Sequence, residues 1–260
     1  MLEITLPVLL VVALACFLTG LSKGGLGGAM GALITPMLSL VMPINLAIGL
    51  FLPFLMVADV FAVGVHWRRW DWKLARLLLA GALVGVGLGT LFITRVSPAV
   101  LRRTLGVLIL LFALYRLVEP YVLKKLRRSD ASLSVKPLSR FGLYFWLGLL
   151  AGVLAGFAST IASAGGPPVA IYLLMLNLPP VTFVATVAIF ITILNWIKVP
   201  YYLSAGILRL DLALQMAWLV PLVPLGAWIG KRLVQRINRS VFERLVIGLL
   251  LASSFLLLFR

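Results

Sequence analysis

The chain is a succession of apolar blocks, most of them close to the length that a helix needs to cross a lipid bilayer. About 20 helical residues span the ~30 Å hydrocarbon core. Such blocks lie at residues 4–22, 28–42, 46–65, 73–94 and 99–118, and again at 141–161, 165–178, 182–203, 210–230 and 241–259. Hydrophobic residues make up 63% of the chain and charged residues 12%, whereas soluble domains have about 45–50% and about 25%. The sequence therefore predicts an all-α polytopic membrane protein.

The blocks form two sets of five, and the second block of each set is short and follows an interruption. The interruptions are GLSKGGLGGAMG at 20–31 and STIASAGGPP at 159–168. A shift of 136 residues aligns Gly20 with Gly156 and Pro43 with Pro179. We expect two repeated halves, in which matching interruptions indicate a transporter binding site. The expected divisions are an N-terminal transmembrane repeat at 1–118, a basic cytoplasmic loop at 119–140 and a C-terminal transmembrane repeat at 141–260.

Basic residues set the expected orientation. The net charge is +16, but Lys and Arg lie in short runs between apolar blocks, which is typical of cytoplasmic loops and argues against a nucleic-acid partner. If every block crosses, there are ten spans and the halves are inverted. If the short blocks are re-entrant, there are eight spans and the halves are parallel. We expect inversion. Because the first residues lack a basic run, we also expect residues 1–22 to remain as a transmembrane segment.

One carboxylate lies deep within an apolar block. Asp59 stands in FLPFLMVADVFAVG, and a charge at the bilayer centre costs about 2.5–3.5 kcal/mol on insertion scales. It can therefore be a buried acid paired with a base, a site for a coupling proton or Na⁺, or a residue that lies nearer the interface than the count of residues suggests. Asp71 and Asp211 each stand where a block begins, and we expect them to cap helices.

Two lysines are the matching cations. Lys23 lies in the first interruption and can contact an anion, pair with Asp59 or extend to the interface. Lys198 lies late in its block, in NWIKVPYY, where the same extension or an anion contact is open. Asn195 aligns with Asp59 under the shift of 136 residues.

The interruptions can supply further ligands for an anion. A helix that starts inside the membrane has N–H groups without partners, and these attract negative charge. Glycine allows a ligand to approach the backbone, and hydroxyl groups add donors. The candidates are Ser22, Gly24 and Gly25 in the first interruption and Ser159, Thr160, Ser163, Gly165 and Gly166 in the second. The alternative for the glycines is close helix packing, which we expect for Gly81, Gly85 and Gly89.

Several other functions find little support. His66 is the single histidine and precedes the interfacial WRRWDW segment, so a serine–histidine enzyme is not expected. The buried acids, histidines and cysteines are too few for a metal site, and no phosphate-binding loop for ATP is present. We expect no enzyme activity, no cofactor and no metal.

Five segments carry a resemblance to a known family. They are LSKGGLGGAMG (21–31), PFLMVADVFA (53–62), WRRWDW (67–72), SAGGPPVAIYLL (163–174) and IFITILNWIKVPYYLSAG (189–206). The chain resembles the TauE/SafE-type sulfite exporters, also called the four-toluene-sulfonate uptake permease family. The resemblance implies a bacterial inner-membrane protein associated with sulfite, sulfonates or related organosulfur anions. It also makes Ser22, Lys23, Asp59, Asn195 and Lys198 functional candidates.

The leading hypothesis is a secondary transporter for a small anion, working by alternating access. Its expected partners are an organosulfur or sulfite-like anion, the lipid bilayer, a coupling H⁺ or Na⁺ at Asp59, and a second copy of the chain. A passive anion channel and a membrane scaffold without transport activity are the alternatives.

Overall fold

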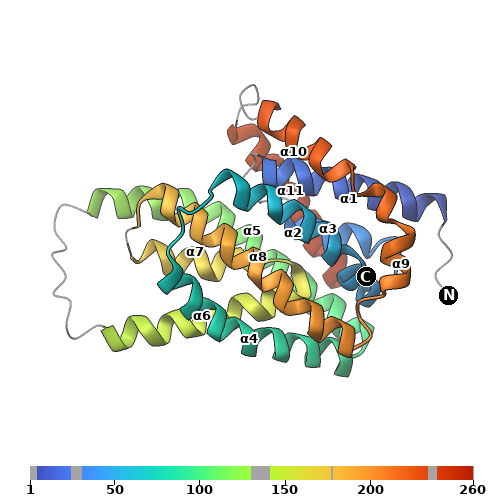
Figure 1. Ribbon diagram of the computed structural model, residues 1–260, viewed down its shortest axis with the longest axis horizontal. Helices are drawn as coiled ribbons and strands as arrows, with labels where there is room; N and C mark the ends of the chain where they lie inside the picture. The colour runs from blue at the N-terminus through green and yellow to red at the C-terminus, as the bar shows by residue number, and fades with distance from the viewer. Residues whose placement is uncertain (1–4, 25–30, 130–140, 177, 234–238, 260) are drawn as a thin grey trace.

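The computed structural model describes residues 5–24, 31–129, 141–176, 178–233 and 239–259, and the regular elements in them are helices. The first half contains α1 (Leu6–Gly24), α2 (Gly31–Leu38), α3 (Ile44–Val65), α4 (Trp72–Arg95) and α5 (Pro98–Ser129). The second half contains α6 (Phe141–Ala162), α7 (Gly166–Leu174), α8 (Pro180–Ser204), α9 (Leu210–Gln215), the 3-10 turn η1 (Ala217–Leu219), α10 (Leu222–Leu233) and α11 (Arg239–Phe259) (Figure 1). The predicted all-α class is confirmed.

Within the described residues, six helices are long and apolar enough to cross a membrane: α1, α3, α4, α5, α6 and α8. A shorter apolar stretch, Val246–Phe259, forms most of α11. The short helices α2 and α7 have 8 and 9 residues. At 1.5 Å per residue neither covers half of the ~30 Å hydrocarbon core. The second block of each half is thus interrupted and short, as predicted, and a total of eight to ten spans stays a prediction.

Two boundaries differ from the expected ones. Helix α5 continues to Ser129, so the first part of the segment expected to form a loop is helical. The block at 210–230 is broken into α9, η1 and α10, whereas its counterpart in the first half is the continuous helix α4. Pro221 and Pro224 lie in this region, and because proline has no N–H group it interrupts the hydrogen bonds of a helix.

The first helix of each half packs against the fourth segment of the other half. Helix α1 lies against α10, and α6 lies against α4. At the first contact Gly20 faces the backbone of Val223 and Ala227, and at the second Gly156 faces the backbone of Ala82 and Val86. Ala82 and Val223 are separated by the same number of residues as Val86 and Ala227. The two interfaces are therefore equivalent, which supports the predicted duplication.

Small residues let the backbones touch along both interfaces. Gly81 and Gly85 of α4 face the carbonyl groups of Leu149 and Val153 of α6, and Gly89 faces the side chain of Thr160. The packing role expected for these three glycines is confirmed. Close contact of small residues is a common way for helices to associate in lipid. The hydrophobic effect does not favour association there, because the lipid tails are as apolar as the side chains.

The third helices of the halves, α3 and α8, cross between these pairs in opposite directions. Asp59 of α3 contacts Asn195 of α8. Earlier in α3, Gly49 contacts Ile207, which follows the end of α8. Equivalent helices therefore run antiparallel, and Figure 1 shows the same for α1 and α6, which run in opposite directions along the long axis. This antiparallel order agrees with the expected inversion, and the orientation of the halves in the membrane stays a prediction.

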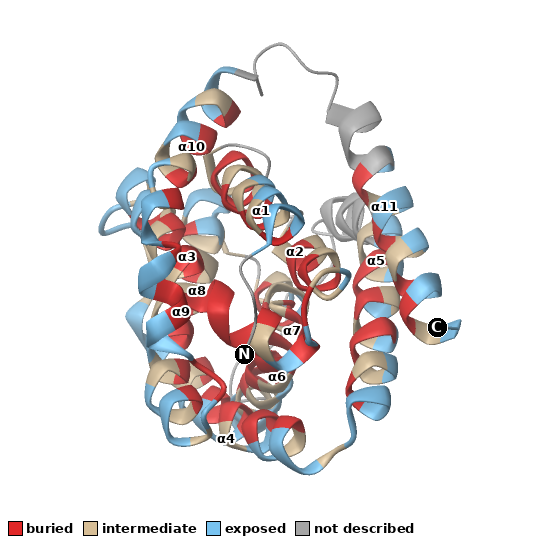
Figure 2. Cartoon of the chain, turned by 90° about the vertical axis from the view of Figure 1, so that its right-hand side faces the viewer, coloured by how far each residue is buried: buried red, intermediate tan, exposed pale blue. Residues whose placement is uncertain are grey.

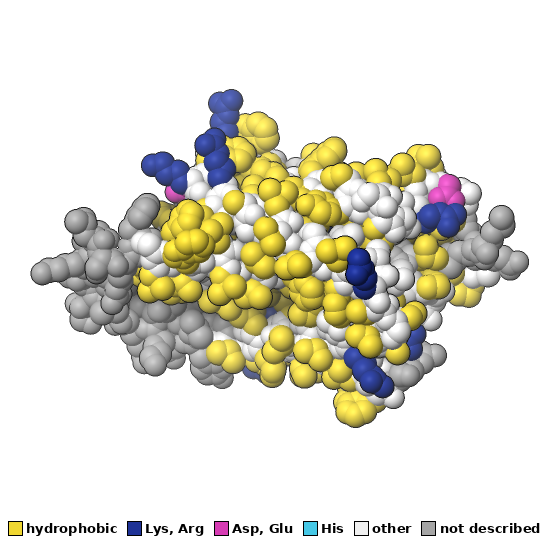
Figure 3. Space-filling view, turned by 90° about the horizontal axis from the view of Figure 1, so that it is seen from below, with side chains coloured by type: hydrophobic (Ala, Val, Ile, Leu, Met, Phe, Trp, Pro, Cys, Tyr) yellow, Lys and Arg dark blue, Asp and Glu magenta, His cyan; other side chains and the backbone are white. Residues whose placement is uncertain are grey.

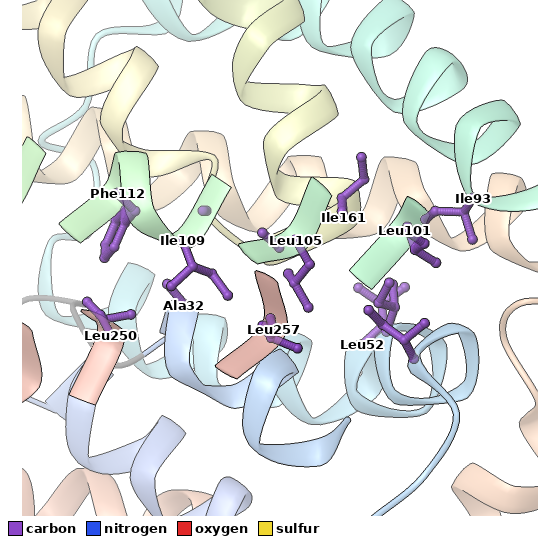
Figure 4. Close-up of a cluster of buried hydrophobic side chains, with 14 of the residues drawn as sticks. Ala32, Leu52, Ile93, Leu101, Leu105, Ile109, Phe112, Ile161, Leu250 and Leu257 are labelled. Atoms are coloured by element: carbon purple, nitrogen blue, oxygen red, sulfur yellow. The ribbon is translucent and has the colours of Figure 1, made fainter. Parts of the chain in front are cut away.

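Apolar side chains fill the interior and also cover the outside. One interior cluster joins Ala32 of α2, Leu52 of α3, Leu105 of α5 and Leu257 of α11 (Figure 4). Viewed along the long axis, buried faces turn inward (Figure 2). The outward faces still carry large apolar residues such as Leu10, and apolar atoms dominate the middle of the face in Figure 3. This surface suits lipid rather than water.

Candidate functional site

The first charged contact joins the end of α1 to the middle of α3. Lys23 Nζ donates a hydrogen bond to Asp59 Oδ1 at 2.5 Å. The Asp59 side chain is completely buried, whereas that of Lys23 is 19% exposed. Of the alternatives left open by the sequence, the structure has the ion pair. An isolated carboxylate would be very unfavourable in such apolar surroundings, and the ammonium group offsets that cost.

The second contact joins the two halves of the chain. Asn195 Nδ2 of α8 donates to Asp59 Oδ2 at 2.6 Å. Because an ionised carboxylate only accepts hydrogen bonds, the amide nitrogen must face it. The amide oxygen, Asn195 Oδ1, then faces away and accepts from Lys198 Nζ at 3.0 Å. The residues that the shift of 136 aligns, Asp59 and Asn195, therefore meet in space.

Lys198 is buried inside the protein and does not extend to the interface. Its side chain is 1% exposed, and Nζ also donates to the carbonyl oxygen of Ser159 at 2.9 Å. One turn later in α8, the Tyr202 hydroxyl donates to the carbonyl oxygen of Thr160 at 2.7 Å. Both carbonyl groups belong to the last turn of α6, where helical N–H donors run out. The carbonyl oxygen of Ser159 also accepts from the N–H group of Ser163 at 3.0 Å, and Lys198 adds a second donor to it. Lys198 and Tyr202 thus bind the end of α6 to α8 inside an apolar interior.

We call the linked groups the core cluster: the side chains of Lys23, Asp59, Asn195 and Lys198 and the carbonyl group of Ser159. The alignment of the halves pairs Lys23 with Ser159 and Asp59 with Asn195. In each half an ammonium group therefore links these two aligned positions: Lys23 itself binds Asp59, and Lys198 binds both Ser159 and Asn195. In the first half it comes from α1, and in the second half it comes from α8. With all three groups ionised, two ammonium groups and one carboxylate give the core cluster a formal charge of +1.

The other predicted residues that the structure describes lie outside the core cluster. Ser22 is buried near the end of α1, Gly24 faces the backbone of Ala227 in α10, and Gly25 lies outside the described residues. The Thr160 hydroxyl donates to the carbonyl oxygen of Gly156 at 2.7 Å. Thus the structure brings together Lys23, Asp59, Ser159, Asn195 and Lys198 and uses Gly24 for packing.

The second interruption offers fewer backbone donors than the sequence suggested. Ser163 turns the chain with a φ of 52°, and Gly165 fits against Ala155 and Ser159. Helix α7 then begins at Gly166, followed by Pro167 and Pro168. Since prolines have no N–H group, two of the first four donors of α7 are missing. The ammonium groups are therefore the stronger attraction for an anion here.

Sequence reasoning missed the role of Tyr202. The signal was present, because Asn195, Lys198 and Tyr202 are spaced by three and four residues and so share one face of a helix. All three side chains are buried and use their polar atoms within the protein. One polar stripe on α8 thus holds both the bond to α3 and the two bonds to α6.

As for metals, the described residues contain no group of three His, Cys, Asp or Glu side chains placed to bind one.

Comparison with known proteins identifies the family of the chain. The family model described as "Sulfite exporter TauE/SafE" matches residues 12–257. No curated protein and no solved structure matches the chain. The matched region includes every residue of the core cluster and both halves. The chain therefore belongs to the TauE/SafE family of sulfite exporters and is a multi-pass membrane transport protein.

Proposed function

We propose that the protein is a secondary transporter that moves sulfite, a sulfonate or a related organosulfur anion across the bacterial inner membrane by alternating access. The observation that carries the proposal is the core cluster. It puts two ammonium groups and a single carboxylate inside the apolar helices, at the contact between the two halves. A negatively charged guest is what this excess of positive charge favours.

The hydrogen-bond capacity of the core cluster supports an anion as the guest. An ammonium group has three N–H donors, and Lys198 gives two of them to Asn195 and Ser159. Oxygen atoms of a sulfite-like anion would accept hydrogen bonds from the remaining N–H group of Lys198 and from the N–H groups of Lys23 that do not bind Asp59. Charge-assisted bonds of this kind are roughly twice as strong as neutral ones, and the low dielectric of the interior strengthens them further.

The helix packing supports alternating access. Close glycine contacts bind α1 to α10 and α6 to α4, so each pair can move as one body. Helices α3 and α8 cross between the pairs and are tied by the bond between Asp59 and Asn195. In inverted-repeat transporters, one body rocks against the other around a fixed central site. Asp59, fully buried in this contact, would take up the coupling H⁺ or Na⁺.

A flux assay with the purified protein in liposomes tests the proposal. We expect saturable uptake of sulfite or a sulfonate, with little chloride flux. Lys198→Met should lower the flux at least about tenfold, because removing one member of a buried charged cluster costs several kcal/mol. Lys73→Met is the matched control, since Lys73 is exposed at the start of α4, and it should transport like the wild type. Gel filtration would confirm that both variants are folded.

The alternatives give different results in the same assay. A passive channel would show flux that rises linearly with anion concentration and ignores gradients of H⁺ and Na⁺. A membrane scaffold would show no flux, and no anion would raise its melting temperature. Equal flux through the wild type and Lys198→Met would remove the core cluster from the transport pathway.

A further inference from the structure

The two halves meet at a pair of side chains that have the same shape but differ in charge. Asp59 and Asn195 occupy aligned positions on α3 and α8 and are hydrogen-bonded to each other. Outward from this pair, each half provides one ammonium group, Lys23 beside Asp59 and Lys198 beside Asn195. The arrangement is close to symmetric in geometry, and the carboxylate of Asp59 is its one negative charge.

Charge balance inside the apolar helices limits what this arrangement can hold. An uncompensated charge in a low-dielectric interior is strongly unfavourable. A guest with one negative charge neutralises the core cluster while Asp59 stays ionised. A guest with two negative charges leaves the complex with one excess negative charge, and a proton on Asp59 neutralises that charge. Both complexes are then neutral, but only the second contains an added proton.

We propose that the charge of the transported anion determines its proton stoichiometry: a monoanion binds without a proton, and a dianion binds together with one proton on Asp59. The inference rests on the proposed function and specifies the substrate class, because it makes the site one for both singly and doubly charged sulfur oxyanions. Sulfite exists in both charge forms near neutral pH, so one substrate could use both modes.

The hydrogen bonds show how the proton would act. Asp59 binds Lys23 through Oδ1 and Asn195 through Oδ2. A proton on Oδ1 removes the acceptor of Lys23, so this ammonium group is released to meet the second negative charge of the guest. Oδ2 still accepts from Asn195, and the contact between the halves is kept. Lys23 has the access that this step needs, since its side chain is 19% exposed.

Other charged groups lie outside the core cluster. Of the described helices packed against α3, α2 has no charged residue. Asp211 on α9 and Lys231 and Arg232 on α10 are exposed to the surroundings. The arginines of α5 at positions 102, 103 and 116 do not belong to the hydrogen-bonded set. Among the residues that the structure describes, Lys23 from α1 and Lys198 from α8 are thus the charges that face Asp59.

Two anions of fixed charge test the inference. Sulfate stays a dianion and methanesulfonate a monoanion throughout the working range, and both are compact tetrahedral groups. Binding to the purified wild-type protein would be measured by calorimetry at several pH values, with sulfite as the reference ligand. We expect sulfate to bind more tightly as the pH falls, by up to about tenfold per pH unit when one proton is taken up. Methanesulfonate binding should not change with pH.

The variant Asp59→Asn separates the proton from the anion. With an amide in place of the carboxyl group and both lysines protonated, the core cluster carries two positive charges. Sulfate binding should lose its pH dependence, and the preference for sulfate over methanesulfonate should rise at least about tenfold. Asp211→Asn is the matched control, since it removes an exposed carboxylate, and it should retain the wild-type behaviour.

The outcomes distinguish this inference from the function on which it rests. Equal pH dependence for sulfate and methanesulfonate in the wild type would overturn the inference and leave anion transport intact. An unchanged preference in Asp59→Asn would do the same. If sulfite, sulfate and methanesulfonate all fail to bind and to move, the proposed function is wrong and the inference fails with it. The wild-type comparison decides the matter even if Asp59→Asn does not fold.

Discussion

The two halves of the molecule agree in their packing and differ at their meeting point. Gly20 on α1 and Gly156 on α6 make equivalent backbone contacts with α10 and α4. Where α3 meets α8, by contrast, Asp59 faces Asn195. The lysines also come from different places, Lys23 from a first helix and Lys198 from a third helix. Symmetry is thus kept in the helix interfaces and is lost among the charged groups.

The difference has a physical reason. A helix interface in lipid depends on close fit, so both copies need a small residue at the same positions. The stability of the core cluster depends on charge. A carboxylate at both aligned positions would place two like charges in contact. An amide at one position keeps the hydrogen bond and removes the repulsion. The core cluster therefore has one carboxylate, shared by two halves that each bring an ammonium group.

The largest expected effect comes from removing the shared carboxylate. Asp59→Leu leaves the ammonium groups of Lys23 and Lys198 without their counter-ion, and breaking a buried pair in this way costs about 3–5 kcal/mol. We expect a clearly lower melting temperature of the purified protein in detergent. The double variant Lys23→Met with Asp59→Leu should recover part of the loss, because the first unpaired ammonium group is then gone as well.

The double variant is the sharper half of this experiment. If Lys23→Met with Asp59→Leu is less stable than Asp59→Leu alone, the stabilising partner of Asp59 is not Lys23. A melting temperature of Asp59→Leu equal to that of the wild type would mean that the core cluster does not hold the halves together.

A smaller effect, equal in both halves, is expected at the helix interfaces. A methyl group at Gly20 or Gly156 would overlap backbone atoms of the facing helix, and the helices would have to move apart. Overpacking of this kind costs about 1–3 kcal/mol. Gly20→Ala and Gly156→Ala should therefore lower the melting temperature by similar amounts. Gly31→Ala is the control, because a methyl group there meets open space.

Unequal effects would show that the two interfaces are not equivalent in energy. A strong effect of Gly20→Ala with none of Gly156→Ala would limit the symmetry to the backbone geometry. A stabilising effect at both sites would remove the glycine contacts as the reason for the pairing.

Much of the scaffold was predictable from the sequence because lipid restricts what a chain can do. The apolar blocks became helices, and the short helices α2 and α7 follow the two interruptions. The packing role of Gly81, Gly85 and Gly89 followed from their spacing of four residues. The crossing of partners between the halves was not predictable, because the same small residues would allow α1 to pack on its own neighbours.

The residues of the core cluster could be predicted from the sequence, but their contacts could not. Lys23, Asp59, Asn195 and Lys198 were singled out as polar groups in apolar blocks, yet the sequence left open whether Lys198 extends to the interface. In the structure Lys198 is buried between Asn195 and the carbonyl group of Ser159 at the end of α6. That end is brought to Lys198 by tertiary packing, and no local pattern indicates it. The same holds for Tyr202, whose partner lies in another helix.

The smallest expected effect concerns the aligned acids Asp71 and Asp211, which the sequence treats alike. Asp71 Oδ1 accepts from the N–H groups of Lys73 and Leu74 and so caps α4, as predicted. Asp211 pairs instead with Arg209, and both of these side chains are about half exposed. Loss of a capping acid costs about 0.5–2 kcal/mol, whereas exposed ion pairs contribute little.

Asp71→Ala should therefore lower the melting temperature of the purified protein, and Asp211→Ala should leave it nearly unchanged. The measurement is the same thermal unfolding in detergent, and Asp71→Ser is the rescue variant, since serine also caps helices. Recovery with serine would assign the loss to capping rather than to charge. An equal loss in Asp71→Ala and Asp211→Ala would mean that α9 depends on its acid as much as α4 does. The break between α9 and α10 argues against that, because a helix of 6 residues has little of its own structure for a cap to stabilise.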